Sequence, residues 1–272
     1  MLGLTVLLLA VARPQTVVSL PRLEGTVILA FDVSGSMAAT DMQPNRMEAA
    51  KAAAREFVLR QPRSVLVGVV AFSDSGLSVQ TPTNDQDLVL AAIGRLAPQR
   101  GTSLGEGVLK SVDAIVVSRG DPPKIYTNLT PTPAAEPTPA IDDGSAAIVL
   151  LTDGENNVAP DPLAAAQYAA EQGVRLYPIG IGSPEGATLE VEGFTVHTQL
   201  DERLLRSMAE LSQGAYFSAA NQEELQTIYD SINLKLVVKP EKTEVTALVA
   251  GIGGLALLIG AALSILWLGR MP

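Results

Sequence analysis

The stretch that decides the fold is Thr26–Met37, TVILAFDVSGSM. Its first half, Val27–Phe31, is an unbroken apolar run, which is typical of a strand buried on both faces of a parallel sheet. Its second half changes at once to aspartate, serine and glycine. Because ligands of open parallel sheets bind beyond the carboxyl ends of the strands, the stretch predicts a central strand with a polar site at its end.

Strand and helix signals alternate on both sides of this stretch. Further strands are predicted at 65–72, 146–151, 174–181 and 215–218. Helices are predicted at 46–60, 85–96, 103–117, from 161 onward, at 202–211 and from 221 to about 234. Such alternation requires crossover connections. We therefore expect an α/β, Rossmann-like domain over residues 25–238, with a doubly wound, mostly parallel sheet and helices on both faces.

Two segments interrupt the alternation. Residues 118–145 are rich in proline and polar side chains, which predicts an exposed, irregular insert loop. Residues 187–200 carry alternating apolar side chains around Glu192-Gly193, which predicts a β-hairpin.

Both ends of the chain are apolar. Residues 245–268 form an uncharged run of 24 residues, about 36 Å long as a helix, which predicts a transmembrane helix in the lipid bilayer. Residues 1–12 are too short to span. They fit a signal-like segment, since Ala10-Val11-Ala12 has the form of a cleavage site, or the tail of a longer membrane helix, which we favour.

Composition excludes several classes of function. The formal net charge is −10, and an acidic chain repels phosphate backbones, so we expect no nucleic-acid partner. The sequence has no cysteine. Disulfides, thiolate metal sites and cysteine nucleophiles are therefore excluded.

Oxygen donors follow two predicted strands and precede one predicted helix: Asp32, Ser34, Ser36, Thr102 and Asp153. Two carboxylates and three hydroxyls suit Mg²⁺, or Mn²⁺ or Ca²⁺, better than zinc. Hydroxyls are neutral ligands, so the cation would retain positive charge and could bind an Asp or Glu carboxylate from a protein partner. Taken singly, the same residues also fit an N-capping turn, an ordinary helix start and an Asp-Gly turn.

Three segments, FDVSGSM, GTSLGEG and LLTDGENN, resemble the parts of the metal-ion-dependent adhesion site (MIDAS) of von Willebrand factor A (VWA) domains. The resemblance implies that Ser34, Ser36 and Thr102 coordinate the metal directly. It implies that Asp32 and Asp153 do so directly or through water.

Longer segments, DVSGSMAATDMQPNRMEAAK and LDERLLRSMAELSQGAYFSA, resemble bacterial membrane-anchored VWA proteins of the Bat type. This resemblance implies that the protein lies in the bacterial cell membrane, with its VWA domain outside the cytoplasm and membrane helices on either side of that domain. It also implies an assembly or stress-related factor that acts with a MoxR-type ATPase or other membrane complex subunits. A count of basic residues around 245–268 favours the opposite topology, but large domains cross membranes largely regardless of charge.

The alternative function is a Mg²⁺-dependent hydrolase or phosphatase on the same site. Phosphotransfer sites on similar sheets often use two aspartates two residues apart, and here the second position is Ser34. No general base is evident, so we expect no enzyme and no catalytic residue. Asp41 and Asp74 are expected to be solvated loop residues, and His197 has no assignable role.

Overall fold

The structure is a computed structural model. It describes residues 15–18, 23–99, 101–120, 146–182, 186–191, 194–198, 200–219, 221–231, 237–238 and 241–244, with a few positions between 254 and 262. The chain divides into two compact units, Leu23–Val237 and a second unit formed by Met1–Arg22 with Val238–Pro272. The segment predicted at 1–12 and most of the proline-rich insert lie outside the described residues.

The first unit contains a seven-stranded sheet whose main path is β4-β3-β2-β5-β6-β9. Its strands are β2 (Leu23–Asp32), β3 (Val65–Phe72), β4 (Gly76–Thr83), β5 (Ala146–Thr152), β6 (Val174–Ile181), β9 (Phe217–Ala219) and β10 (Val237–Val238). Every pairing along the path is parallel except that of β3 with β4. The expected α/β fold is therefore confirmed, with a sheet that is mixed at one edge.

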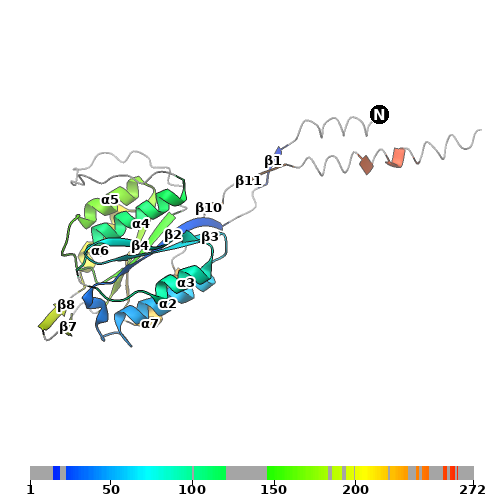
Figure 1. The fold of residues 1–272 in the computed structure, drawn as a ribbon. Helices are drawn as coiled ribbons and strands as arrows, with labels where there is room; N and C mark the ends of the chain where they lie inside the picture. Colours follow the sequence, from blue (N-terminus) through cyan, green and yellow to red (C-terminus); the bar gives the residue numbers. More distant parts are fainter. Residues whose placement is uncertain are drawn as a thin grey trace, which may run out of the picture. The chain divides into compact units, whose positions relative to one another are not determined.

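Helices cover both faces of the sheet (Figure 1). One face carries α2 (Arg46–Arg60), α3 (Gln86–Gly94) and α7 (Gln222–Ser231), and the other carries α4 (Leu104–Ser118), α5 (Pro162–Glu171) and α6 (Glu202–Leu211). A short 3-10 helix, η1 (Gly35–Ala38), follows β2. Each of the helices α2 to α7 begins after a residue whose side chain accepts a hydrogen bond from a backbone N–H of the first turn: Asn45, Asp85, Ser103, Asp161, Asp201 and Asn221.

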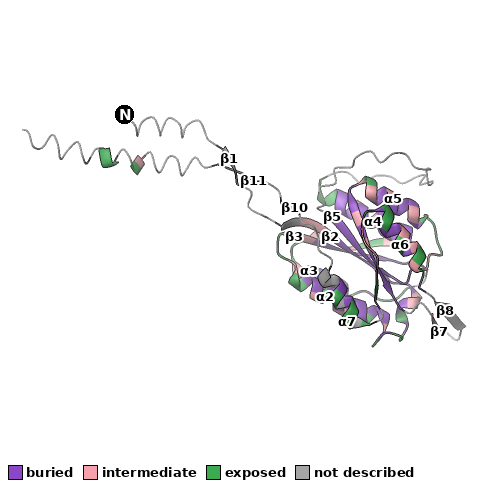
Figure 2. Ribbon diagram, turned by 180° about the vertical axis from the view of Figure 1, so that it is seen from behind, coloured by how far each residue is buried: buried purple, intermediate pink, exposed green. Residues whose placement is uncertain are grey.

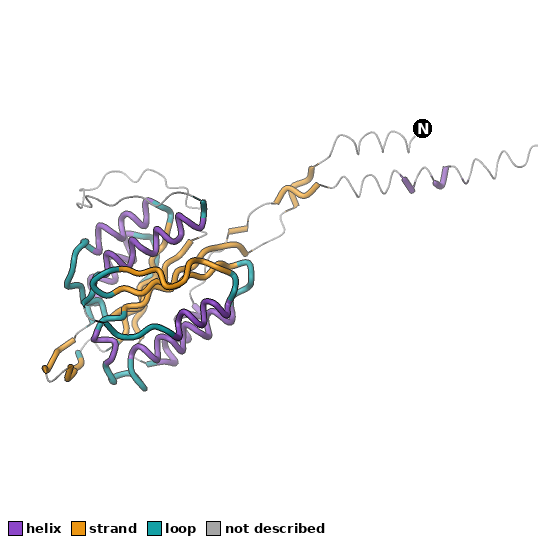
Figure 3. The backbone as a smooth tube through the Cα atoms, in the orientation of Figure 1, coloured by secondary structure: helices purple, strands orange, loops and turns teal. Residues whose placement is uncertain are grey.

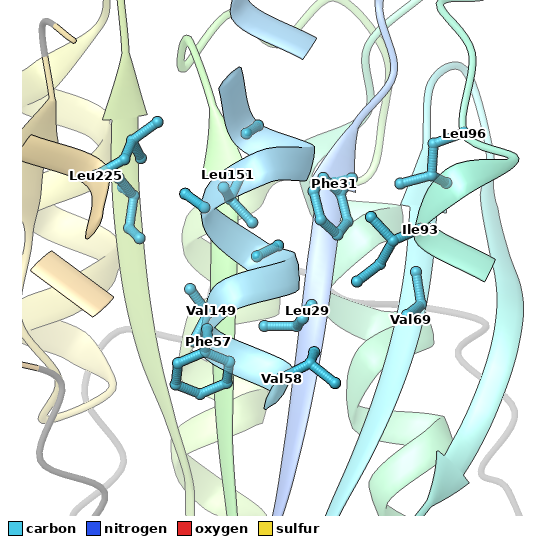
Figure 4. Close-up of a cluster of buried hydrophobic side chains, with 14 of the residues drawn as sticks. Leu29, Phe31, Phe57, Val58, Val69, Ile93, Leu96, Val149, Leu151 and Leu225 are labelled. Atoms are coloured by element: carbon cyan, nitrogen blue, oxygen red, sulfur yellow. The ribbon is translucent and has the colours of Figure 1, made fainter. Parts of the chain in front are cut away.

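Strand β2 shows why the sheet needs two layers of helices. Its side chains alternate between the two cores: Leu29 and Phe31 pack under α2 and α3, whereas Ile28 packs with α4 and α5. Figure 4 shows Phe57 and Val58 lying over the first of these cores, and Figure 2 shows the central strands of the sheet mostly buried. An apolar run with no polar alternation is the sequence signature of a strand covered on both sides.

Strand β4 is not predicted from the sequence. Its residues, GLSVQTPT, include four polar side chains and Pro82, which argue against a central strand. The strand lies at the edge of the sheet, is partly exposed and pairs only with β3, so it tolerates both features. The last predicted strand is displaced, because β9 spans Phe217–Ala219 rather than 215–218.

Two further strand pairs lie outside the sheet. β7 (Ala187–Val191) pairs antiparallel with β8 (Phe194–Thr198), in the segment where alternation predicts a hairpin. In the second unit, β1 (Gln15–Val18) pairs antiparallel with β11 (Glu241–Glu244).

Within the described residues, the structure contains no helix that is both long and apolar enough to span a bilayer. Most of the predicted span at 245–268 falls outside those residues. Leu255, Leu258 and Ile259, which are described, are exposed.

Helix α4 approaches the sheet closely through Gly107. A Cβ atom at Gly107 would lie 2.6 Å from the Phe72 ring, the last residue of β3. This contact fixes the start of α4 against the carboxyl end of the sheet, where the polar segments lie.

Gly107→Ala should destabilise the protein by about 1–3 kcal/mol, because the added methyl group meets an aromatic ring that is itself fully buried. Gly94→Ala is the matched control. It also lies in a helix, but its Cβ would meet only the flexible end of Arg55, at 3.4 Å. Thermal unfolding should show a drop of several degrees for the first variant and no loss for the second. Equal midpoints would contradict the close approach.

Candidate metal centre

Asp32 and Asp153 come from neighbouring strands. β2 and β5 run parallel with Phe31 opposite Leu151, so the residues that follow them emerge side by side. The loops at this end of the sheet are drawn in Figure 3. Both aspartates are fully buried, at 0% exposure.

The Asp32 carboxylate is held by hydrogen bonds to both of its oxygens. Oδ1 accepts from the Ser34 backbone N–H at 2.8 Å, and Oδ2 accepts from the Thr152 hydroxyl at 2.7 Å. Thr152 in turn accepts from the Gly154 N–H at 3.0 Å. The carboxylate is therefore fixed in orientation before any ligand binds.

The two serines form a pair of hydroxyls beside this carboxylate. Ser34 Oγ lies 2.9 Å from Ser36 Oγ. Ser34 is buried, whereas Ser36, in η1, is only partly buried. The pair thus leads from the buried carboxylates toward solvent.

Thr102 lies in a turn that is hydrogen-bonded to the neighbouring segments. Its carbonyl accepts from the Asn157 N–H at 3.0 Å, and the nearby Gln99 N–H donates to the Val33 carbonyl. Gly101 has a φ of +83°, and a Cβ there would lie 2.7 Å from Asp74 Cβ. Only glycine fits this left-handed and crowded position. The Thr102 segment is therefore held between the other two.

Asp153 is fixed from two directions. Its Oδ2 accepts from Arg46 Nη1 at 3.2 Å, and its Oδ1 accepts from the Glu155 N–H at 3.3 Å. Its backbone carbonyl accepts from the Asp201 N–H at 3.0 Å, which ties the loop to the start of α6.

Burial dominates the electrostatics of the site. Burial and, after it, the neighbouring charge of Asp153 raise the pKa of Asp32, against the hydrogen bonds from Ser34 and Thr152 that lower it, and the net value is about 7. Two buried carboxylates that repel each other are stabilised by a cation between or beside them. In the described part of the chain, no group of three or more His, Cys, Asp or Glu residues is placed to hold a metal. A cation here would depend on the hydroxyls too, and the donor set fits a hard divalent ion.

Sequence reasoning misses the supporting residues. Arg46 is fully buried and binds both Asp153 and Asp41. Asp41 lies in an exposed loop, as expected, but its side chain is 21% exposed and is paired with this guanidinium, which the sequence does not predict. Asn156 is more than a turn residue, since its side chain accepts from the Leu104 N–H at 2.9 Å. Asp74 is exposed as expected, and the His197 side chain lies outside the described residues.

The fold and the segments at its carboxyl edge define a von Willebrand factor type A domain, and a family model of that domain matches residues 27–155. A protein from Nocardia farcinica described as a UPF0353 protein is 30% identical over 287 residues, covering 100% of this chain and 81% of its own. The chain belongs to the UPF0353 family.

Solved structures share the fold. BatB from Bacteroides thetaiotaomicron, described as a conserved hypothetical protein, has a TM-score of 0.59 and 27% identity over 76% of this chain and 97% of its own. An aerotolerance-related membrane protein from Bacteroides fragilis has a TM-score of 0.61 and 24% identity, and the match covers 78% of this chain and 98% of its own. Proximal thread matrix protein 1 from the mussel byssus, described with a zinc-occupied MIDAS motif, has a TM-score of 0.54 and 19% identity. The match covers 84% of this chain and 50% of its own. The resemblance to Bat-type VWA proteins is confirmed.

The raised pKa of Asp32 predicts how stability without metal depends on pH. The folded protein retains a proton at Asp32 up to about pH 7, whereas the ordinary value for the carboxyl is 3.8. Between these values the folded state binds more protons, so the Asp32 contribution lowers stability as pH rises and is fully unfavourable above 7.

In EDTA, Asp32→Asn should therefore gain stability relative to the wild type as pH rises from 5 to 8. Asp74→Asn, at an exposed carboxylate in a nearby loop, should follow the wild type. Denaturant unfolding at the two pH values measures both. A difference between Asp32→Asn and wild type that stays constant with pH would show that Asp32 is not a buried charge of this kind.

Proposed function

We propose that this protein is a membrane-anchored VWA module that binds a protein partner through one divalent cation held by Asp32, Ser34, Ser36, Thr102 and Asp153. The observation that carries the proposal is the buried pair Asp32 and Asp153, which adjoins a pair of hydroxyls 2.9 Å apart that leads to solvent. The module acts by binding rather than by catalysis.

The metal half of the proposal is supported by the chemistry of the donors and by the family. VWA domains commonly bind a divalent metal at the MIDAS, and a related fold is described with zinc there. Here the oxygen donors favour Mg²⁺, Mn²⁺ or Ca²⁺. The cation would supply an electrophilic centre. The five oxygen donors would hold the cation, and burial keeps water from the carboxylates of Asp32 and Asp153.

The partner half is supported by the charge of the ligand set. With three neutral hydroxyls and two carboxylates, one of which also binds Arg46, the cation would retain attraction for an anion. The partly buried Ser36 leaves the outer side accessible. A partner Asp or Glu side chain supplies the matching group.

The setting proposed for the module is the outer side of the bacterial cell membrane, with residues 245–268 in the bilayer. Support comes from the similar fold described as an aerotolerance-related membrane protein. We propose in addition that it serves as an assembly or stress-related factor with a MoxR-type ATPase.

Ser34→Ala should weaken Mg²⁺ binding about tenfold or more, because it removes one of the three proposed hydroxyl ligands. Ser75→Ala, at an exposed serine in a neighbouring loop whose hydroxyl donates to Asp74, is the control and should bind as wild type. Isothermal titration calorimetry measures both. Partner complexes captured by crosslinking should form in Mg²⁺ and be lost in EDTA and in Ser34→Ala. Capture that persists undiminished in both would exclude the metal as the binding device.

Protease treatment of intact spheroplasts tests the setting. A domain outside the cytoplasm should be digested without lysis, whereas a cytoplasmic marker should survive. A protected domain would contradict the proposed topology. It would place the domain in the cytoplasm, where it could contact a cytoplasmic ATPase directly.

A further inference from the structure

Arg46 is a buried charge that belongs to no part of the expected metal site. It is the first residue of α2, and its side chain is 0% exposed. Its guanidinium binds Asp41 with two parallel hydrogen bonds, Nε to Oδ1 at 2.8 Å and Nη2 to Oδ2 at 2.7 Å. The remaining arm, Nη1, reaches Asp153 Oδ2 at 3.2 Å.

The surrounding backbone is shaped around this side chain. Gly182 follows β6 with a φ of +115°, and a Cβ there would lie 2.5 Å from Arg46 Nη2. The Arg46 backbone N–H donates to the Ala39 carbonyl at 3.0 Å, which draws the loop carrying Asp41 against the helix start. A buried guanidinium is stable only when its charge and donors are matched, and here two carboxylates do so.

Four charged side chains lie in or beside the proposed metal site. With all carboxylates ionised, Asp32, Asp153 and Asp41 contribute three negative charges and Arg46 one positive charge. A divalent cation would bring this set to neutrality. Arg46 touches Asp153, a proposed ligand, whereas Asp41 contacts the guanidinium and is partly exposed at 21%. The positive end of the Arg46–Asp41 pair therefore faces the metal position.

We propose that Arg46 is a positioning residue that sets the affinity of the site for its metal. This inference rests on the metal site of the proposed function. The guanidinium orients Asp153 and offsets part of its charge, so the cation binds more weakly but keeps more attraction for a partner carboxylate. Asp41 moderates this effect by neutralising the far side of the guanidinium. The charges buried here are weakly screened, so their effects on a divalent ion are large.

Two neutralising variants give opposite results under this proposal. Arg46→Gln keeps amide donors for Asp153 but removes the positive charge, so Mg²⁺ should bind about tenfold more tightly. Asp41→Asn keeps the shape of the loop but leaves the guanidinium charge uncompensated, so Mg²⁺ should bind about threefold more weakly, its effect reduced by exposure. Calorimetric titration of the full chain with MgCl₂ at pH 8 and low salt measures both dissociation constants.

Thermal unfolding, measured without and with Mg²⁺, is a second readout. Without Mg²⁺, Arg46→Gln should unfold at a lower temperature than wild type. Saturating Mg²⁺ should then raise the unfolding temperature of the variant by more than it raises that of wild type. If Arg46 serves only to pack or position, both variants bind Mg²⁺ more weakly, and the charge account is overturned.

Unchanged affinity in both variants would also overturn the account. Should Arg46→Gln fail to fold, Asp41→Asn decides: weaker binding supports the proposal, and tighter or unaltered binding refutes it. A wild-type chain that takes up no Mg²⁺ would instead overturn the metal site itself, together with this inference.

Discussion

The site depends on the approach of two buried carboxylates, Asp32 and Asp153. They meet because β2 and β5 are adjacent parallel strands and each turns into a polar loop at the same edge. Burial and, after it, the charge of Asp153 make an ionised Asp32 unfavourable in the absence of a cation, which is why the pKa of Asp32 is raised. The two apolar cores on either face of the sheet offset this local cost. Functional sites commonly retain such unfavourable arrangements where chemistry requires them.

Much of the fold is predictable from the sequence because local and global signals agree. The apolar run Val27–Phe31 predicts a strand covered on both faces, and the helices predicted to start at 85, 103 and 161 start within one residue of those positions. Strand β4 escapes prediction because an edge strand needs neither apolar alternation nor every backbone donor. Its place is set by pairing with β3, which no local pattern reports.

The candidate site divides in the same way. The positions of its proposed ligands are predictable because two strand ends and the start of one helix carry polar segments, each beside a glycine, and the strand ends meet at one edge of the sheet. Arg46 is not predictable, since an arginine at a helix start looks like a solvated surface residue. Its contact with Asp153 spans 107 residues of sequence. Asn156 is concealed likewise, with a partner 52 residues away. Residues that position a site act through tertiary contacts, and only the folded chain reveals them.

We propose a binding module whose metal is held by two carboxylates and three hydroxyls, with Arg46 setting the affinity of the site. The central claim is that one divalent ion occupies the carboxyl edge of the sheet. A crystal structure grown with Mn²⁺ and measured for anomalous scattering tests this directly. The account predicts one strong peak within coordinating reach of the Ser34, Ser36 and Thr102 hydroxyls. At saturating Mn²⁺, the absence of a peak there, or a peak elsewhere alone, would contradict it.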